Sequence, residues 1–271
     1  MKLYGTALSS AAFRVRIALN LKGLAHEHAF VDLGRGAQAT AEYLAVNPQG
    51  LVPALVDGDV VLTQSMAILE HLEESYNDLP LVPADKLARA QVRSFCLSIC
   101  CDIHPLNNLR VMQYLKGPLD IGDEEFLTWY AHWIDEGYRY AEQFAKEHSS
   151  NGRFVFGDSA TLADVFLIPQ SYNAHRFKVP LDDYPTLVSI EKACNELPAF
   201  KAALPETQPD ALPPVGKGFE EMTFSNLVGQ PRPLRGVAQK LPDPRLLSNQ
   251  QHVKGNEIGL LIMRHFQMTD G

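Results

Sequence analysis

The chain has 271 residues, 46% of them hydrophobic and 21% charged, which is typical of a globular protein with two modest domains or one large one. A formal net charge of −8 argues against a nucleic-acid partner, because such a partner requires a basic face. Apolar stretches are too short to cross a bilayer, and the N-terminus lacks a charged region followed by an apolar block. We therefore expect a cytoplasmic protein without a membrane or nucleic-acid partner.

The first predicted elements are a short strand at residues 2–4 and a helix at residues 12–22. Apolar residues in the second segment recur at the spacing of one helix face, and a glycine follows it as a stop signal. Ser9 and Ser10 stand at its start, where first-turn N–H groups and the helix dipole favour a negative charge. The two serines therefore either cap the helix only or also bind an anionic group.

A β-hairpin is predicted after a further strand at residues 26–31. Asp57-Gly58 separates the apolar runs LVPALV and VVLTQ, which is a strong hairpin signal. Pro53 cannot donate to a strand ladder, so the Val52-Pro53 bond is expected at an edge or bend and is a candidate for a cis peptide. A cis bond there would leave the Val52 N–H and C=O free for a peptide-like ligand.

A helix at residues 65–76 follows the hairpin, and Gln64-Ser65 opens it. Ser65 and the free amides of this helix start can bind a carboxylate. The N-terminal unit ends near residue 82, in the sequence PLVP. Its order is strand, helix, strand, and then two strands and a helix.

The pattern beyond residue 85 is helical. Helices are expected at residues 87–115, 124–147, 187–196 and 199–203. The first of these can bend at Pro105. Thr161 and Asp164 have the spacing of a capping-box variant ahead of the apolar run VFLIP, so we expect them to fix a helix start in the middle of the second domain.

The cysteine pattern indicates neither a metal site nor a disulfide. Cys96 and Cys100 lie one helical turn apart, but no other residues with zinc spacing accompany them. Cys101 and Cys194 complete the set of four. In a cytoplasmic chain, buried and reduced thiols are the expected state.

Taken together, these features resemble the glutathione S-transferases, and in particular the zeta class, which includes maleylacetoacetate and maleylpyruvate isomerases. The resemblance covers residue 1 to about residue 210 and rests on RVRIALNLKG, VNPQGLVPAL, QSMAILEHLEE, GDSATLADVFLIPQ, RFKV and a QPD near the end. It implies an α/β thioredoxin-like domain at residues 1–82, an all-helical domain at residues 86–211 and a homodimer.

The resemblance also implies a glutathione site, in which the Ser9 hydroxyl donates to the cofactor's sulfur. The residues expected to bind the cofactor are Ser9, Ser10, Gln49, Val52, Pro53, Gln64, Ser65, His104 and Asn108. His104 and Asn108 lie one helical turn apart in the segment DIHPLNNLR. They either line this site or are polar helix residues that face the interface between the domains.

Arg110 and Arg176 are the expected substrate residues. Both stand among apolar neighbours, where an arginine usually pairs with an internal acid. Because DIHPLNNLR and NAHRF both resemble zeta-isomerase segments, bidentate binding of substrate carboxylates is favoured instead. The implied reaction is cis–trans isomerisation. The glutathione thiolate adds to a double bond, the resulting single bond rotates, and the thiolate is expelled while one of the two arginines stabilises the enolate.

Departures from the family leave other functions open. Ala11 stands where many zeta enzymes have a cysteine, which argues against a reductive dehalogenase. Leu8 stands where some bacterial maleylpyruvate isomerases have an arginine, which leaves room for a less acidic or more aromatic substrate. The alternatives are a transferase or thiol-dependent lyase acting on an aromatic electrophile, then a dehalogenase, and last a non-catalytic glutathione-binding protein.

The last sixty residues extend beyond the family's usual end. Proline and glycine are frequent in residues 213–244, which predicts an extended strap without its own core. The segment at residues 257–268 is strongly apolar and is expected to be buried. We expect it to pack on the dimer partner or beside the active-site cleft.

Overall fold

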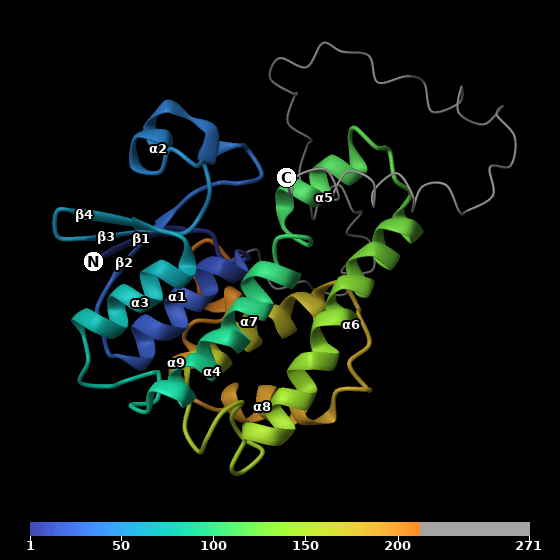
Figure 1. Ribbon diagram of the computed structural model, residues 1–271. Coiled ribbons are helices and arrows are strands. Elements are labelled where there is room, and N and C mark those ends of the chain that lie inside the picture. Colours follow the sequence, from blue (N-terminus) through green and yellow to red (C-terminus); the bar gives the residue numbers. More distant parts are fainter. Residues whose placement is uncertain (212–271) are drawn as a thin grey trace, which may run out of the picture. The chain divides into compact units, whose positions relative to one another are not determined.

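A computed structural model describes residues 1–211 (Figure 1). The extension at residues 212–271, and with it the expected packing of residues 257–268, lies outside the described residues. All described residues belong to one compact unit, so the division into domains at residues 1–82 and 86–211 stays a prediction. None of the helices within residues 1–211 has both the length and the apolar character that a membrane span requires.

The N-terminal part contains a four-stranded mixed sheet with the strand order β2-β1-β3-β4. The strands are β1 (Lys2–Gly5), β2 (Glu27–Phe30), β3 (Ala54–Asp57) and β4 (Val60–Thr63). β1 pairs in parallel with β2, and the crossover between them contains the helix α1 (Ser10–Leu21). β3 and β4 form the predicted hairpin, in which Gly58 adopts a φ of 59° that favours glycine.

Two helices cover the sheet and complete the predicted thioredoxin-like order, namely α1 and α3 (Ser65–Ser75). A small core joins them to the strands, with Leu3, Val15, Leu19, Leu55, Ile68 and Leu72 fully buried. The sequence did not predict the 3-10 turn η1 (Ala37–Ala39) or the helix α2 (Ala41–Val46). α2 has only six residues, too few for an apolar period to be recognised.

The C-terminal part is helical, as predicted. Its elements are α4 (Lys86–Leu97), the π-helical segment η2 (Ser98–Ile103), α5 (Leu109–Lys116), α6 (Asp123–His148), α7 (Leu162–Arg176), α8 (Pro185–Cys194), α9 (Pro198–Lys201) and the 3-10 turn η3 (Pro205–Thr207). The expectation of one helix at residues 87–115 was wrong, because the chain leaves the helical path after η2. Asn108 caps a separate helix, α5, by accepting a hydrogen bond from the N–H of Arg110 at 2.9 Å.

The predicted capping box at the start of α7 is confirmed. Thr161 Oγ1 accepts from the N–H of Ala163 at 3.2 Å, and Asp164 Oδ2 accepts from the N–H of Thr161 at 2.8 Å. Asp164 Oδ1 also accepts from the N–H of Val155, while burial raises the pKa of this carboxyl to about 6. These bonds fix a buried helix that packs against α1 and α4.

The end of the described chain holds the loop between β1 and α1. Asp210 Oδ2 accepts hydrogen bonds from Thr6 Oγ1 at 3.0 Å and from the N–H of Ala7 at 2.8 Å. Asp210 Oδ1 lies 3.2 Å from Nε2 of His28, and burial lowers the pKa of that imidazole. The buried Arg16 adds bonds to the carbonyls of Ala7 and Ala203. The helical part therefore fixes the loop that leads into α1.

We expect Asp210→Ala to lower the free energy of unfolding by about 2–3 kcal/mol, because two donors lose their acceptor in a partly buried place. Chemical denaturation monitored by circular dichroism measures this loss. Glu27→Ala is the control, since it removes only a surface ion pair with Lys2 and should cost less. Equal effects of the two substitutions would contradict the assigned role of Asp210.

Candidate active site

One cavity of about 580 Å³ collects every site residue that the sequence predicts. It is lined by the loop between β1 and α1, the loop before β3, the start of α3 and the walls formed by η2, α5, α6 and α7. The predicted residues among its lining are Ser9, Ser10, Gln49, Val52, Pro53, Gln64, Ser65, His104, Asn108, Arg110 and Arg176. The individual roles assigned to these residues stay predictions.

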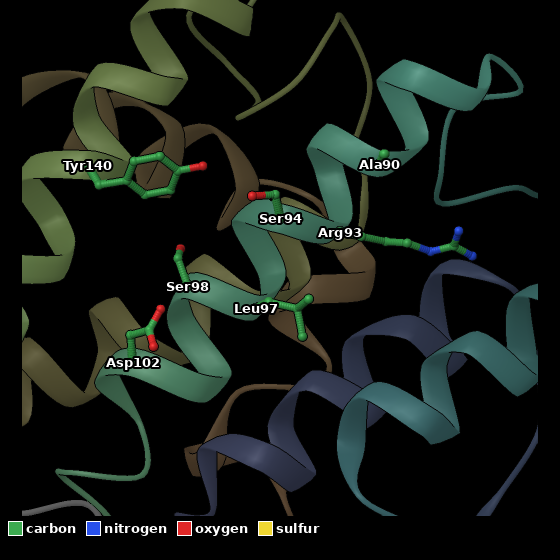
Figure 2. A pocket seen from close by; sticks show the side chains of 7 residues that line it. All are labelled: Ala90, Arg93, Ser94, Leu97, Ser98, Asp102 and Tyr140. Atoms are coloured by element: carbon green, nitrogen blue, oxygen red, sulfur yellow. The ribbon is translucent and has the colours of Figure 1, made fainter. Parts of the chain in front are cut away.

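A second hollow, of about 600 Å³, lies on α4 and η2 and is bordered by Tyr140 of α6 (Figure 2). Its lining consists of Ala90, Arg93, Ser94, Leu97, Ser98, Asp102 and Tyr140. Leu97 contributes to both cavities, but none of the predicted site residues lies in this one. The cavity described first is therefore the candidate active site.

Ser9 is both a helix cap and a cavity residue. Its Oγ accepts a hydrogen bond from the N–H of Ala12 at 3.2 Å, which satisfies one free amide of α1. Since the cap uses a lone pair of the oxygen, the hydroxyl proton stays available to an acceptor in the cavity. Ser10 is buried in the first turn of α1. An anion at this helix end would gain both a donor and the favourable end of the helix dipole.

The predicted cis bond between Val52 and Pro53 is confirmed. Gln64 also lines the cavity and lies just before α3. Its φ is 68°, a value that residues other than glycine seldom adopt. Its Nε2 donates to Gln49 Oε1 at 2.9 Å, so the two glutamines are held together. Residues held in such conformations are enriched at functional sites.

Arg14 contacts Ser65, and the sequence analysis did not predict it as a site residue. Its side chain is only 1% exposed, Nη1 donates to Ser65 Oγ at 3.3 Å, and the guanidinium lies 4.5 Å from the ring centre of Phe166. Within residues 1–211, Nε and Nη2 have no hydrogen-bond partner. Burial lowers the pKa of Arg14 to about 10, which leaves it charged at neutral pH. Its local sequence, inside the helical segment RVRIALNLKG, does not distinguish it from an ordinary helix residue.

His104 and Asn108 line the cavity from the end of η2 and the start of α5. Burial, and then the charges of Arg14 and Arg110, lower the pKa of His104 to about 3, so its imidazole is neutral at physiological pH. Asn108 caps α5 through its Oδ1, which is a structural role next to the cavity. Asn108 therefore lines the cavity and caps α5, while its expected role toward the cofactor stays a prediction.

Arg110 and Arg176 bring positive charge to the cavity from two elements. Arg110 is exposed in the first turn of α5, and Arg176 is partly buried at the end of α7. Burial lowers the pKa of Arg176, while the nearby phenols of Tyr130 and Tyr172 act in the opposite direction. With Arg14, three guanidinium groups line one cavity. The carboxylates of Asp32 and Asp210 line the same cavity, so the arginines leave it a net positive charge that favours an anionic ligand.

Two thiols also reach the cavity. Cys100 and Cys101 line it from η2, with their sulfur atoms 3.8 Å apart. Burial raises the pKa of Cys100 to about 11, so it is protonated at neutral pH. The expectation that all cysteines are buried was wrong for Cys101, which is exposed. Among residues 1–211, no cluster of three or more side chains suited to a metal ion occurs.

Comparisons with known proteins identify relatives of this chain. Residues 8–75 match a family model described as "Glutathione S-transferase, N-terminal domain". A probable maleylacetoacetate isomerase of Vibrio cholerae is 47% identical over 211 residues, which are 77% of this chain and 97% of the relative.

Two solved structures are similar over nearly the same length. A bacterial maleylpyruvate isomerase, a zeta-class glutathione S-transferase in its holo form, is 43% identical with a TM-score of 0.77, covering 78% of this chain and 100% of its own. A maleylacetoacetate isomerase of Methylobacterium extorquens AM1, with bound malonate and GSH, is 41% identical with a TM-score of 0.75, covering 79% and 100%.

Proposed function

We propose, because this chain belongs to the zeta-class glutathione S-transferase family, that it is a glutathione-dependent cis–trans isomerase of a small unsaturated dicarbonyl acid. The substrate class is that of maleylpyruvate and maleylacetoacetate. The observation that carries this proposal is that one cavity contains a serine at a helix start, a cis-proline loop and three arginines, of which Arg110 and Arg176 come from the helical part. The relative with bound GSH and the dicarboxylate malonate shows that a protein of this fold accepts both kinds of ligand.

Glutathione would bind in the part of the cavity that is lined by the loop before β3 and the start of α3. The backbone of Val52, next to the cis-proline, would pair with its peptide groups. Gln64 and Ser65 would hold its γ-glutamyl carboxylate at the start of α3, where the helix dipole favours an anion. The bond from Arg14 to Ser65 Oγ leaves the Ser65 proton free to donate to that carboxylate.

The thiol would then lie near Ser9. A hydrogen bond from the Ser9 hydroxyl and the dipole of α1 both stabilise the thiolate over the thiol, which lowers the thiol's pKa. The thiolate adds to the cis double bond, and the electron pair moves to the conjugated carbonyl as an enolate. After rotation about the new single bond, the enolate expels the thiolate and the trans bond forms. Glutathione is regenerated, so it acts as a cofactor.

Arg110 and Arg176 would bind the carboxylates of the substrate and stabilise the enolate charge. Assays with maleylpyruvate, maleylacetoacetate and chlorodinitrobenzene, with and without glutathione, test the proposal. We expect trans product from one of the acids only when glutathione is present, without net consumption of glutathione. Isomerisation that proceeds equally well without glutathione, or one glutathione consumed per turnover, would exclude the proposed mechanism.

A glutathione transferase or thiol-dependent lyase acting on an aromatic electrophile is the second candidate. Leu8 lines the cavity together with Phe30 and Phe177, which gives it an apolar and aromatic portion. The thiols of Cys100 and Cys101 on η2 also weaken the argument against a dehalogenase that rests on Ala11. Stoichiometric formation of a glutathione adduct from an aromatic chloride would identify this activity.

Removing the hydroxyl of Ser65 should weaken glutathione binding. We expect calorimetry on Ser65→Ala to show a dissociation constant about 5–30 times higher, as for one lost charge-assisted hydrogen bond of roughly 1–2 kcal/mol. Ser75→Ala is the matched control at the exposed far end of α3 and should bind as the wild type does. Unchanged affinity of Ser65→Ala would place the cofactor elsewhere.

We also propose that the protein is a cytoplasmic homodimer. Truncation of the C-terminal extension tests whether residues 212–271 act at the dimer interface or beside the cleft. A chain truncated after Ala211 keeps every residue that lines the cavity within the described part. We therefore expect unchanged glutathione affinity in calorimetry. If residues 212–271 pack on the partner or beside the cleft, sedimentation should show weaker dimerisation, or assays a wider substrate range. Unchanged dimerisation together with unchanged substrate preference would rule out both roles.

A further inference from the structure

Tyr130 carries a buried hydroxyl that no residue of the described chain satisfies. Its side chain is 1% exposed, and Oη has no hydrogen-bond partner within residues 1–211. Burial raises the pKa of this phenol well above its usual value, so it is protonated and able to donate. A buried polar group without a partner is costly, and native proteins retain few of them.

The hydroxyl belongs to a side chain that lines the proposed substrate cavity. Phe177 and Arg176 line the same cavity, and the ring of Tyr130 stacks on that of Phe177 with centroids 4.0 Å apart. The main-chain carbonyl of Tyr130 accepts from Asn107 Nδ2 at 3.2 Å, which fixes the backbone. Arg176 directly precedes Phe177 in the chain, and its charge opposes the effect of burial on the pKa of the phenol. The ring is therefore held beside the predicted carboxylate-binding arginine.

A second tyrosine on the same helix shows the contrast. Tyr138 follows two turns later on α6 and is also fully buried, but its Oη lies 3.0 Å from Ser171 Oγ. Where a phenol serves packing alone, the fold thus supplies a partner for its hydroxyl. Tyr130 instead belongs to the lining of a cavity, and its hydroxyl has no partner among residues 1–211. A substrate oxygen would supply the missing acceptor.

We propose that Tyr130 is a catalytic residue whose hydroxyl donates a hydrogen bond to the substrate oxygen that becomes the enolate. The proposal rests on the isomerase function. Arg176 binds the neighbouring carboxylate, and the phenol stabilises the charge that develops while the thiolate is attached. The proton stays on the phenol, and the bond strengthens as the oxygen gains charge. A protonated donor in a site closed to water needs little reorganisation for this role.

Tyr130→Phe tests the proposal because it keeps the ring and removes only the oxygen. We expect kcat for the cis acid to fall about 10- to 100-fold, with glutathione affinity unchanged. The midpoint of thermal unfolding should be unchanged or higher, since an unsatisfied hydroxyl is removed. Tyr138→Phe is the matched control and should show the reverse, namely a lower midpoint and unchanged kcat. Wild-type kcat in Tyr130→Phe, or an equal loss in both variants, would overturn the proposal.

Failure of the isomerase function can be told apart from failure of this inference. If the wild type does not isomerise the acids, binding of malonate to the glutathione-loaded protein still tests the donor by calorimetry. We expect Tyr130→Phe to bind malonate about tenfold more weakly than the wild type, because one charge-assisted bond is lost. Equal affinities of the two proteins would reject a substrate-binding role for Tyr130.

Discussion

Ser9→Ala is expected to lower isomerase turnover by about 100-fold or more, while glutathione affinity changes little. In the proposed mechanism the Ser9 hydroxyl donates to the sulfur, and this bond is stronger to the thiolate than to the thiol. The substitution therefore removes stabilisation mainly from the reactive form, and loss of one preorganised donor to a developing or full negative charge has effects of this size.

The thiolate absorbance of the bound cofactor, followed against pH, separates this role from capping. Because the hydrogen bond lowers the thiol's pKa, its removal should shift the titration curve to higher pH. Asp85→Ala is the control, since Asp85 caps α4 through bonds from the N–H groups of Leu87 and Ala88 at an exposed place. The Asp85→Ala protein should be less stable than the wild type but should have the same turnover. An unchanged curve in Ser9→Ala would leave Ser9 as a cap only and make Ser10 or water the candidate.

Arg110→Ala and Arg176→Ala should each lower kcat/KM for a dicarboxylate substrate by about 10- to 100-fold. Each guanidinium is expected to form charge-assisted bonds to a carboxylate, and bonds of this kind contribute roughly 1.5–3 kcal/mol. A small neutral electrophile such as chlorodinitrobenzene offers no carboxylate, so its conversion should change little. Steady-state kinetics with both substrates give the comparison.

Arg139→Ala is a suitable control, since Arg139 forms ion pairs with Asp135 and Glu136 on the exposed face of α6. It should affect neither substrate. If Arg110→Ala or Arg176→Ala lowers conversion of the acid and of the neutral electrophile equally, the arginine is structural. The loss would then come from disruption of an internal interaction rather than from lost carboxylate binding.

Features that depend on a few neighbouring residues could be predicted from the sequence. The hairpin at Gly58, the cis bond before Pro53 and the capping box at Thr161 all follow from local backbone chemistry. The break between η2 and α5 could not, because the apolar pattern continues through it. Only the cap formed by Asn108 shows where the new helix begins. The sequence rules identified Pro105 as a possible bend, but they did not predict that the helix is interrupted from residue 104 to residue 108.

The candidate site was predictable as far as the family resemblance reached. Two residues were missed, one inside a quoted motif and one outside, because their importance arises from tertiary packing. Arg14 is an ordinary helix former in the sequence, and only the placement of Phe166 and Ser65 around it shows a buried charge. Tyr130 likewise looks like a core aromatic. Its unpartnered hydroxyl becomes apparent only when α6 and α7 are placed together.

The bonds from Asp210 to Thr6 and Ala7 set the order in which a growing chain can complete its cofactor pocket. They join residues more than two hundred positions apart, so the loop ahead of Ser9 lacks this support until nearly the whole described chain has left the ribosome. Stable binding of glutathione would therefore come late in synthesis, and it would then stabilise the folded chain by mass action.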